Sequence, residues 1–208
     1  MTVAAPKAPK SLRDPAALAW REGQRHAPHL RALRPYLDRL RREHGEVPDP
    51  DPLDGGASAR LLVLLETPGP RIRGTRFVSR DNPTGTAANL FRYLKEAGIP
   101  RDDTLIWNAI PWVIHSPGAR NRAPRPAEVR AGLGTLPDLL SVLDGLRAVV
   151  LAGRTAGQAR PVIGQVRPML RVIDVPHPSP TYVCTSPEVG RAIGRGFAAA
   201  RSVLDGGD

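Results

Sequence analysis

The stretch Leu61-Leu62-Val63-Leu64-Leu65-Glu66-Thr67-Pro68-Gly69 decides the fold class. Its first five residues form a continuous apolar run, which is typical of a strand buried on both faces of a parallel sheet. Pro68-Gly69 predicts a tight turn after the strand. Glu66 therefore stands at the carboxyl end of a strand, where open parallel sheets bind their ligands. We expect its carboxylate at the mouth of a pocket; the alternative is a solvated glutamate on a surface turn.

Strands and helices alternate along the rest of the chain. Apolar runs predict three further strands, and periodic apolar positions with capping residues predict four helices. In chain order these are a helix at 86–97, a strand at 104–108, a helix at 127–142, a strand at 148–151, a short helix after Gly153, a strand at 171–175 and a helix at 186–204. This alternation is typical of a parallel sheet covered on both faces. We therefore expect an α/β fold, a three-layer αβα sandwich around a four-stranded parallel sheet.

The first 58 residues have a different pattern. Asp14-Pro15 is typical of a helix start, and we expect one helix to about residue 24 and a second over residues 28–44. The proline-rich residues 47–52 predict a stiff linker. The expected organisation is thus an N-terminal helical extension with its linker over residues 1–58 and a second domain over residues 59–208.

The amino-acid composition excludes several classes of function for this chain. The chain has 208 residues, a formal net charge of +10 and 41% hydrophobic residues, so it can build a core and favours partners that carry phosphate. Its single cysteine, Cys184, excludes an internal disulfide and a cysteine-held metal cluster. The sequence has no secretory signal pattern and no apolar run of membrane-spanning length, so we expect a cytoplasmic protein with no membrane partner. We also expect a monomer. Phosphate-binding loops of the Walker type and nucleophile elbows are also absent from the sequence.

Three more polar residues stand at or near predicted element ends. Asn108 ends the second strand of the predicted sheet, and its amide could pair with the imide edge of a base. His177 lies between two prolines after the last strand and could donate to an oxygen that gains charge in a transition state. Asp81 precedes the helix at 86–97, three residues before its expected cap, Thr84. Each of these residues alone also fits an ordinary turn or cap.

Five segments, taken in order, resemble the uracil-DNA glycosylase superfamily across about residues 59–204. Their order and spacing carry the resemblance. They are Leu65-Glu66-Thr67-Pro68-Gly69, Arg76-Phe77-Val78 with the helix after it, Trp107-Asn108, Asn121-Arg122-Ala123-Pro124 with Glu128, and His177-Pro178-Ser179-Pro180. The first, second and fourth are most similar to the thermophile-type, iron–sulfur-containing branch. The chain lacks the cysteines of that branch, so we expect no iron–sulfur cluster.

The resemblance implies roles around an extruded base. Glu66 is at the position of the motif's carboxylate, and Thr67-Pro68-Gly69 would face the base and the abasic sugar. Phe77 would stack on the base, and Asn108 would read its pairing edge. His177 would donate to uracil O2 as the N-glycosidic bond breaks. The chemistry that the resemblance implies needs no metal or redox cofactor, so we expect none.

The resemblance also implies contacts with the rest of the DNA. Ser179 and neighbouring amides would hold phosphates, and we group Arg154, at the end of another strand, with them. Tyr182 is where the family places a wedge that fills the vacated stack.

One departure from the family bears on the chemistry. The best-known branch has a catalytic aspartate where this chain has Thr67, so another carboxylate must activate water. Asp81 is one candidate, because a thermophile branch has an aspartate near the start of this helix, and Glu66 is the other.

These features predict a monofunctional DNA glycosylase that hydrolyses the N-glycosidic bond of uracil or a related deaminated base in base excision repair. The first alternative is a module of the same fold that binds damaged or single-stranded DNA without excision. The second is an unrelated hydrolase of small molecules, which the positive charge and the absent nucleophile elbow disfavour.

Overall fold

The computed structural model describes residues 6–207. Its centre is a parallel sheet with the strand order β4-β2-β5-β6, and the strands are β2 (Leu61–Leu65), β4 (Thr104–Asn108), β5 (Ala148–Ala152) and β6 (Arg171–Val175). The α/β fold and the four parallel strands are confirmed. Register pairs Leu65 with Asn108, so the segments that follow β2 and β4 leave the sheet side by side.

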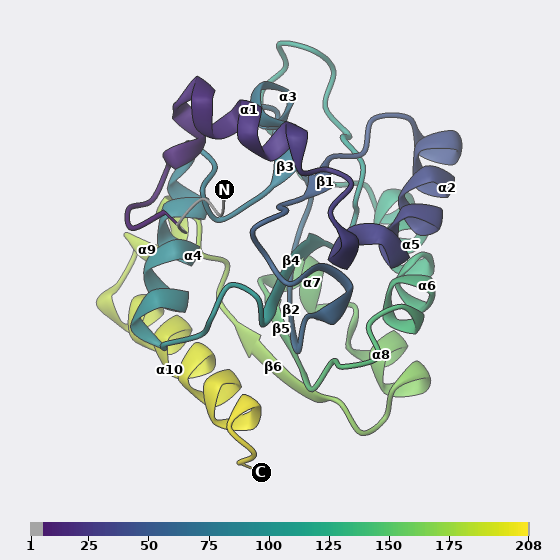
Figure 1. The fold of residues 1–208 in the computed structure, drawn as a ribbon. Helices are drawn as coiled ribbons and strands as arrows, with labels where there is room; N and C mark the ends of the chain where they lie inside the picture. The colour runs from purple at the N-terminus through teal and green to yellow at the C-terminus, as the bar shows by residue number, and fades with distance from the viewer. Residues whose placement is uncertain (1–5, 208) are drawn as a thin grey trace.

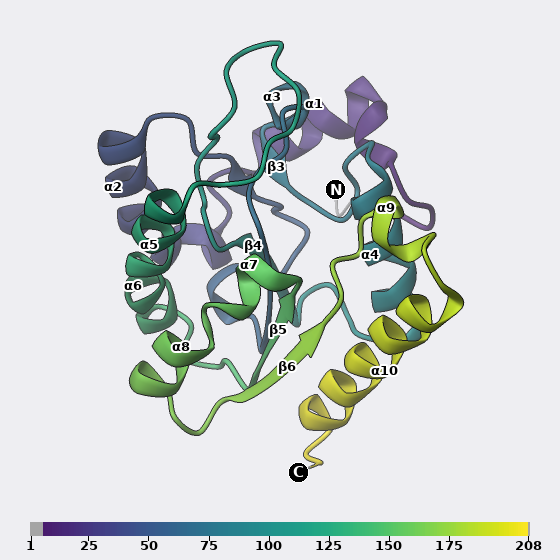
Figure 2. The same ribbon diagram turned by 180° about the vertical axis from the view of Figure 1, so that it is seen from behind.

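Helices cover both faces of the sheet (Figures 1 and 2). α4 and α10 lie on one face, and α5, α6 and α8, with α2 beside them, lie on the other. The α-helices are α1 (Pro15–Gly23), α2 (Arg34–His44), α3 (Ile72–Thr75), α4 (Gly85–Glu96), α5 (Pro126–Gly134), α6 (Leu136–Ser141), α7 (Arg154–Gly157), α8 (Arg160–Val166), α9 (Pro180–Val183) and α10 (Pro187–Leu204). Short 3-10 helices span Ser11–Arg13, Pro28–Leu33 and Gly56–Ser58. No helix in the described part of the chain is long and apolar enough to cross a membrane.

Two helices predicted as continuous are each divided. Residues 28–44 form a 3-10 helix over Pro28–Leu33 and then α2. Pro35, near the start of α2, has no N–H to donate to the preceding turn, which favours a break between the two segments. Residues 127–142 likewise divide into α5 and α6, and Pro137 lies in the first turn of α6.

The segment predicted as a linker differs most from expectation. Asp49–Pro50 forms β1, which pairs in parallel with β3 (Phe77–Val78). Asp51, next to it, is only 1% exposed. A buried carboxylate needs charged partners, and those partners come from α1 and from the segment before β4, as described below. Residues 47–52 are thus packed into the molecule, and the division at residue 58 stays a prediction.

Candidate active site

A cavity of about 320 Å³ opens at the carboxyl ends of β2 and β4. Glu66, Asn108 and His177, which lie far apart in the sequence, all line it. So do residues of the turn after β2, including Thr67-Pro68-Gly69. Its volume is in the range of small-molecule sites, which begins near about 300 Å³. Residues from the carboxyl ends of the parallel strands therefore lie together around one cavity.

Glu66 is oriented by a residue that we did not predict. The hydroxyl of Thr155, in the first turn of α7, donates to Oε2 of Glu66 at 2.6 Å. The backbone of Glu66 is fixed as well, because its carbonyl accepts from the amide of Ile110 at 3.0 Å. One carboxylate oxygen is thus held by α7. Thr155 follows a strand end, but its sequence context does not separate it from an ordinary helix-start threonine.

Asn108 ends β4 and is 5% exposed. Within residues 6–207 no protein group hydrogen-bonds to its side-chain amide, although the residue lines the cavity. The amide can therefore offer one acceptor and two donors to a ligand.

His177 has a defined tautomer. The amide of Ser179 donates to Nδ1 of His177 at 3.2 Å, so in the neutral ring the proton is on Nε2. Burial lowers the pKa of His177, and the nearby Glu66 carboxylate opposes that shift only in part. The ring is consequently neutral near pH 7 and carries a donor N–H on Nε2.

The loop that carries His177 is held by close packing. Asn89 of α4 donates to the carbonyl of Pro178 at 2.8 Å. Gly153, which has a φ of +94°, leaves room for the ring, because a Cβ at that position would lie 2.9 Å from Cβ of His177. Both contacts fix the position of the imidazole relative to the sheet.

Phe77 does not line the cavity. It is fully buried, and its ring faces the guanidinium of Arg25, whose Cζ lies 5.3 Å from the ring centroid. Successive residues of a strand point to opposite faces, so its neighbour Val78 lines the cavity instead. Leu90 and Ile106 add to this apolar part of the lining.

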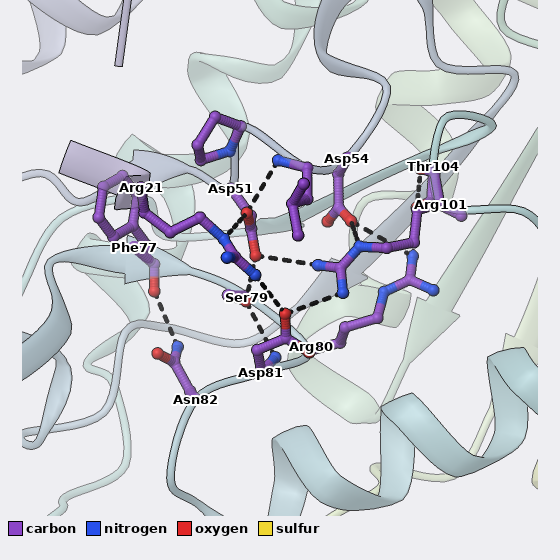
Figure 3. A network of polar contacts seen from close by, with 12 residues as sticks. Arg21, Asp51, Asp54, Phe77, Ser79, Arg80, Asp81, Asn82, Arg101 and Thr104 are labelled. Atoms are coloured by element: carbon purple, nitrogen blue, oxygen red, sulfur yellow. Dashed lines mark hydrogen bonds and ion pairs between the residues drawn. The ribbon is translucent and has the colours of Figure 1, made fainter. Parts of the chain in front are cut away.

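Asp81 also lies outside the cavity lining. Its carboxylate is fully buried and pairs with two guanidinium groups, those of Arg21 at 2.6 Å and Arg101 at 2.8 Å (Figure 3). Burial raises the pKa of Asp81, and the two arginines oppose that shift. Of the two carboxylates predicted to activate water, only Glu66 faces the cavity.

The residues predicted to contact DNA lie on neighbouring segments. Arg154 is exposed at the start of α7, and Ser179 precedes α9. Tyr182, in α9, is 45% exposed, which is unusual for an aromatic side chain of this protein. These segments adjoin Gly153 and His177, which touch each other.

A family model described as the uracil DNA glycosylase superfamily matches residues 52–191. The chain belongs to this superfamily. No curated protein matches the sequence. Among solved structures, a mimivirus UNG variant in complex with UGI is similar, with 15% identity, a TM-score of 0.41, and coverage of 82% of this chain and 72% of that chain.

The cysteine content separates this chain from the iron–sulfur branch of the superfamily. Cys184 is the single cysteine and is exposed. Within residues 6–207, no group of three or more histidine, cysteine or acidic side chains could hold a metal ion.

Proposed function

We propose that this protein is a monofunctional DNA glycosylase that releases uracil or a related deaminated base. The observation that supports the proposal is that Glu66, Asn108 and His177 line one cavity, with the Nδ1 of His177 accepting a hydrogen bond so that its donor is Nε2–H. An enzyme of this kind must first extrude the nucleotide from the stack into such a pocket. We further propose that the protein is a cytoplasmic monomer and that it acts in base excision repair.

Asn108 is proposed to recognise the base. Its amide can accept from N3–H and donate to O4 of uracil, a pattern that cytosine does not offer. The flat base would pack on Val78, Leu90 and Ile106, since Phe77 faces away from the cavity. The turn at Thr67-Pro68-Gly69 would face the sugar.

Bond cleavage is proposed to use His177 and Glu66. The bond between C1′ and the base nitrogen breaks, and its electron pair leaves with the base. The Nε2–H of His177 donates to O2 of the departing anion, and a preorganised neutral donor stabilises that developing charge. A water molecule adds to C1′ and transfers its proton to Glu66, which Thr155 holds in place.

The DNA backbone is proposed to lie across Ser179, Arg154 and α9, with Tyr182 filling the gap left by the extruded base. The net charge of +10 supports a phosphate-bearing partner. The phosphate contacts and the insertion of Tyr182 do not depend on which base is present. A protein that only binds DNA could therefore make them as well.

The test is base release by the wild-type protein. Oligonucleotides that carry uracil, hypoxanthine, xanthine or a mismatched thymine, single- and double-stranded, are incubated with excess enzyme, and abasic sites are counted. We expect release of at least one deaminated base. Tight, salt-dependent DNA binding without release of any base would instead support the non-catalytic module that Thr67, in place of the usual aspartate, allows.

A further inference from the structure

Next to the cavity lies a buried cluster of charged side chains (Figure 3). It joins three arginines to three aspartates, so its formal charges cancel. Five of the six residues are at most 4% exposed, and the sixth, Arg101, has a side-chain exposure of 13%. The members are Arg21, Asp51, Asp54, Arg80, Asp81 and Arg101.

Two guanidinium groups bridge the aspartates. Arg21 donates to Asp51 at 2.9 Å and to Asp81 at 2.6 Å. Arg101 donates to Asp81 at 2.8 Å, to Asp51 at 3.0 Å and to Asp54 at 3.1 Å. Asp81 is thus held from two sides by cations that come from different parts of the chain.

The cluster also fixes the backbone around Asp81. The hydroxyl of Ser79 donates to Asp51 and accepts from the amide of Asp81 at 2.9 Å. The carbonyl of Asp81 accepts from the amide of Leu12 at 3.1 Å. The segment from Ser79 to Asp81 is therefore tied to the N-terminal segment at its side chains and at its main chain.

This same segment forms a wall of the cavity. Val78, Ser79, Asn82 and the following residues up to Thr84 line it. The side chain of Asn82 is used within the wall, since it accepts from the hydroxyl of Thr75 at 2.7 Å and donates to the carbonyl of Phe77 at 2.8 Å. The contacts of Asp81 and those of Asn82 thus hold neighbouring residues of the same wall.

Arg21 lies in α1, outside residues 52–191 that the superfamily model matches. Removing one partner from a buried ion pair leaves an uncompensated charge, so loss of the Arg21 guanidinium would destabilise the cluster around Asp81. The N-terminal segment thereby supplies one of the two cations that hold the wall.

We infer that Arg21 and Asp81 are positioning residues: through them the N-terminal segment sets the wall of the base cavity, and Asp81 is not the group that activates water. The inference rests on the proposed function for its catalytic consequence. Its structural consequence, an ordered wall that depends on Arg21, stands independently of any activity.

The first test compares Arg21→Lys with Arg60→Lys in the full chain. Lysine keeps the charge but cannot reproduce a guanidinium that bridges two carboxylates. Arg60 is the control for the arginine-to-lysine change away from the cavity: its guanidinium pairs with both oxygens of one aspartate, Asp103, at a partly exposed site, and it precedes β2 at the opposite end of the strand from the cavity.

Amide hydrogen exchange at residues 78–82 is the readout that needs no activity. We expect Arg21→Lys to speed this exchange about tenfold or more, while Arg60→Lys leaves it unchanged. Equal protection of residues 78–82 in wild type and Arg21→Lys would overturn the inference.

Single-turnover base release gives the catalytic readout, measured below the unfolding temperature of each variant. Displaced active-site groups commonly lower the rate about tenfold to a hundredfold, and we expect a loss in that range for Arg21→Lys and a change within about twofold for Arg60→Lys. An active wild type with an equally active Arg21→Lys would contradict the inference, whereas an inactive wild type would contradict the proposed function.

Asp81→Asn separates positioning from proton transfer. If Asp81 only positions the wall, the variant keeps the wild-type pH dependence of base release at a lower plateau. If Asp81 activates water, the acid-side loss of activity disappears together with most of the rate, and the inference is wrong. Should Asp81→Asn not fold, the double variant Arg21→Met/Asp81→Asn, which removes one charge of each sign, is used for the same profile.

Discussion

At the scale of single residues, the hydrogen bond from Thr155 to Glu66 is the contact with the clearest catalytic consequence. Its length is 2.6 Å, and it joins two residues 89 positions apart. A hydrogen bond to a charged group contributes about 1.5–3 kcal/mol, and each 1.4 kcal/mol corresponds to about tenfold in rate when the bond acts in the transition state.

Thr155→Val removes the hydroxyl and keeps the shape of the side chain. We expect base release to fall about tenfold or more in single turnovers, because Glu66 loses its fixed orientation. Thr155→Ser restores the donor, and its rate should return to within about threefold of wild type. Equal rates for the valine and serine variants would show that the bond does not orient the carboxylate.

At the scale of elements, the turn between β5 and α7 and the loop that carries His177 depend on each other. Gly153 has a φ of +94°, and a Cβ there would meet both Cβ and the ring of His177. A side chain at this position is strained by its backbone and also displaces the imidazole of His177.

Gly153→Ala should therefore lower the free energy of unfolding by about 1–3 kcal/mol and slow base release as well. Gly157→Ala, in α7, is the matched control, since its added Cβ meets nothing within 4 Å and its φ is not positive. Urea unfolding and single-turnover rates measure the two effects. A Gly153→Ala protein with the stability and rate of the control would refute this dependence.

At the scale of the whole molecule, the buried ion cluster makes stability depend on pH in a direction unusual for a carboxylate. Burial raises the pKa of Asp54 from 3.8 to about 6, and the neighbouring arginines offset only part of that shift. Between these values the folded state binds a proton that the unfolded state does not, so the contribution of Asp54 to stability falls as pH rises from about 4 to about 6 and is constant above.

The prediction concerns the difference in unfolding free energy between wild type and Asp54→Asn, because groups common to both cancel. This difference should fall by roughly 3 kcal/mol as pH rises from about 4 to about 6, and then stay level. Urea unfolding at constant ionic strength measures it. A difference that rises with pH over this interval would mean that Asp54 is ionised more easily in the folded state than in the unfolded one.

Much of the architecture follows from the sequence. The apolar runs and their polar ends predict the four strands, and the convergence of Glu66, Asn108 and His177 follows from parallel strands ending at one edge. Helix breaks were harder to place, because Pro35 and Pro137 lie in first turns, where proline is tolerated, so each can begin a new helix as readily as interrupt a long one.

The parts of the site that sequence did not predict all depend on tertiary contacts. The direction of Phe77 depends on the two-residue strand β3, too short to show alternation. Asp81 is paired because Arg21, which lies 60 residues away in the sequence, donates to its carboxylate. No local pattern distinguishes a carboxylate that will be paired from one that will face a ligand.

The most direct measurement of the central claim is the release of uracil by Asn108→Ala and His177→Ala beside wild type, in single turnovers with saturating enzyme. The account predicts that both variants melt as cooperatively as wild type and still bind the oligonucleotide, while each loses at least about a hundredfold in rate. If both variants release uracil at the wild-type rate, the cavity at the ends of β2 and β4 is not the site of base excision.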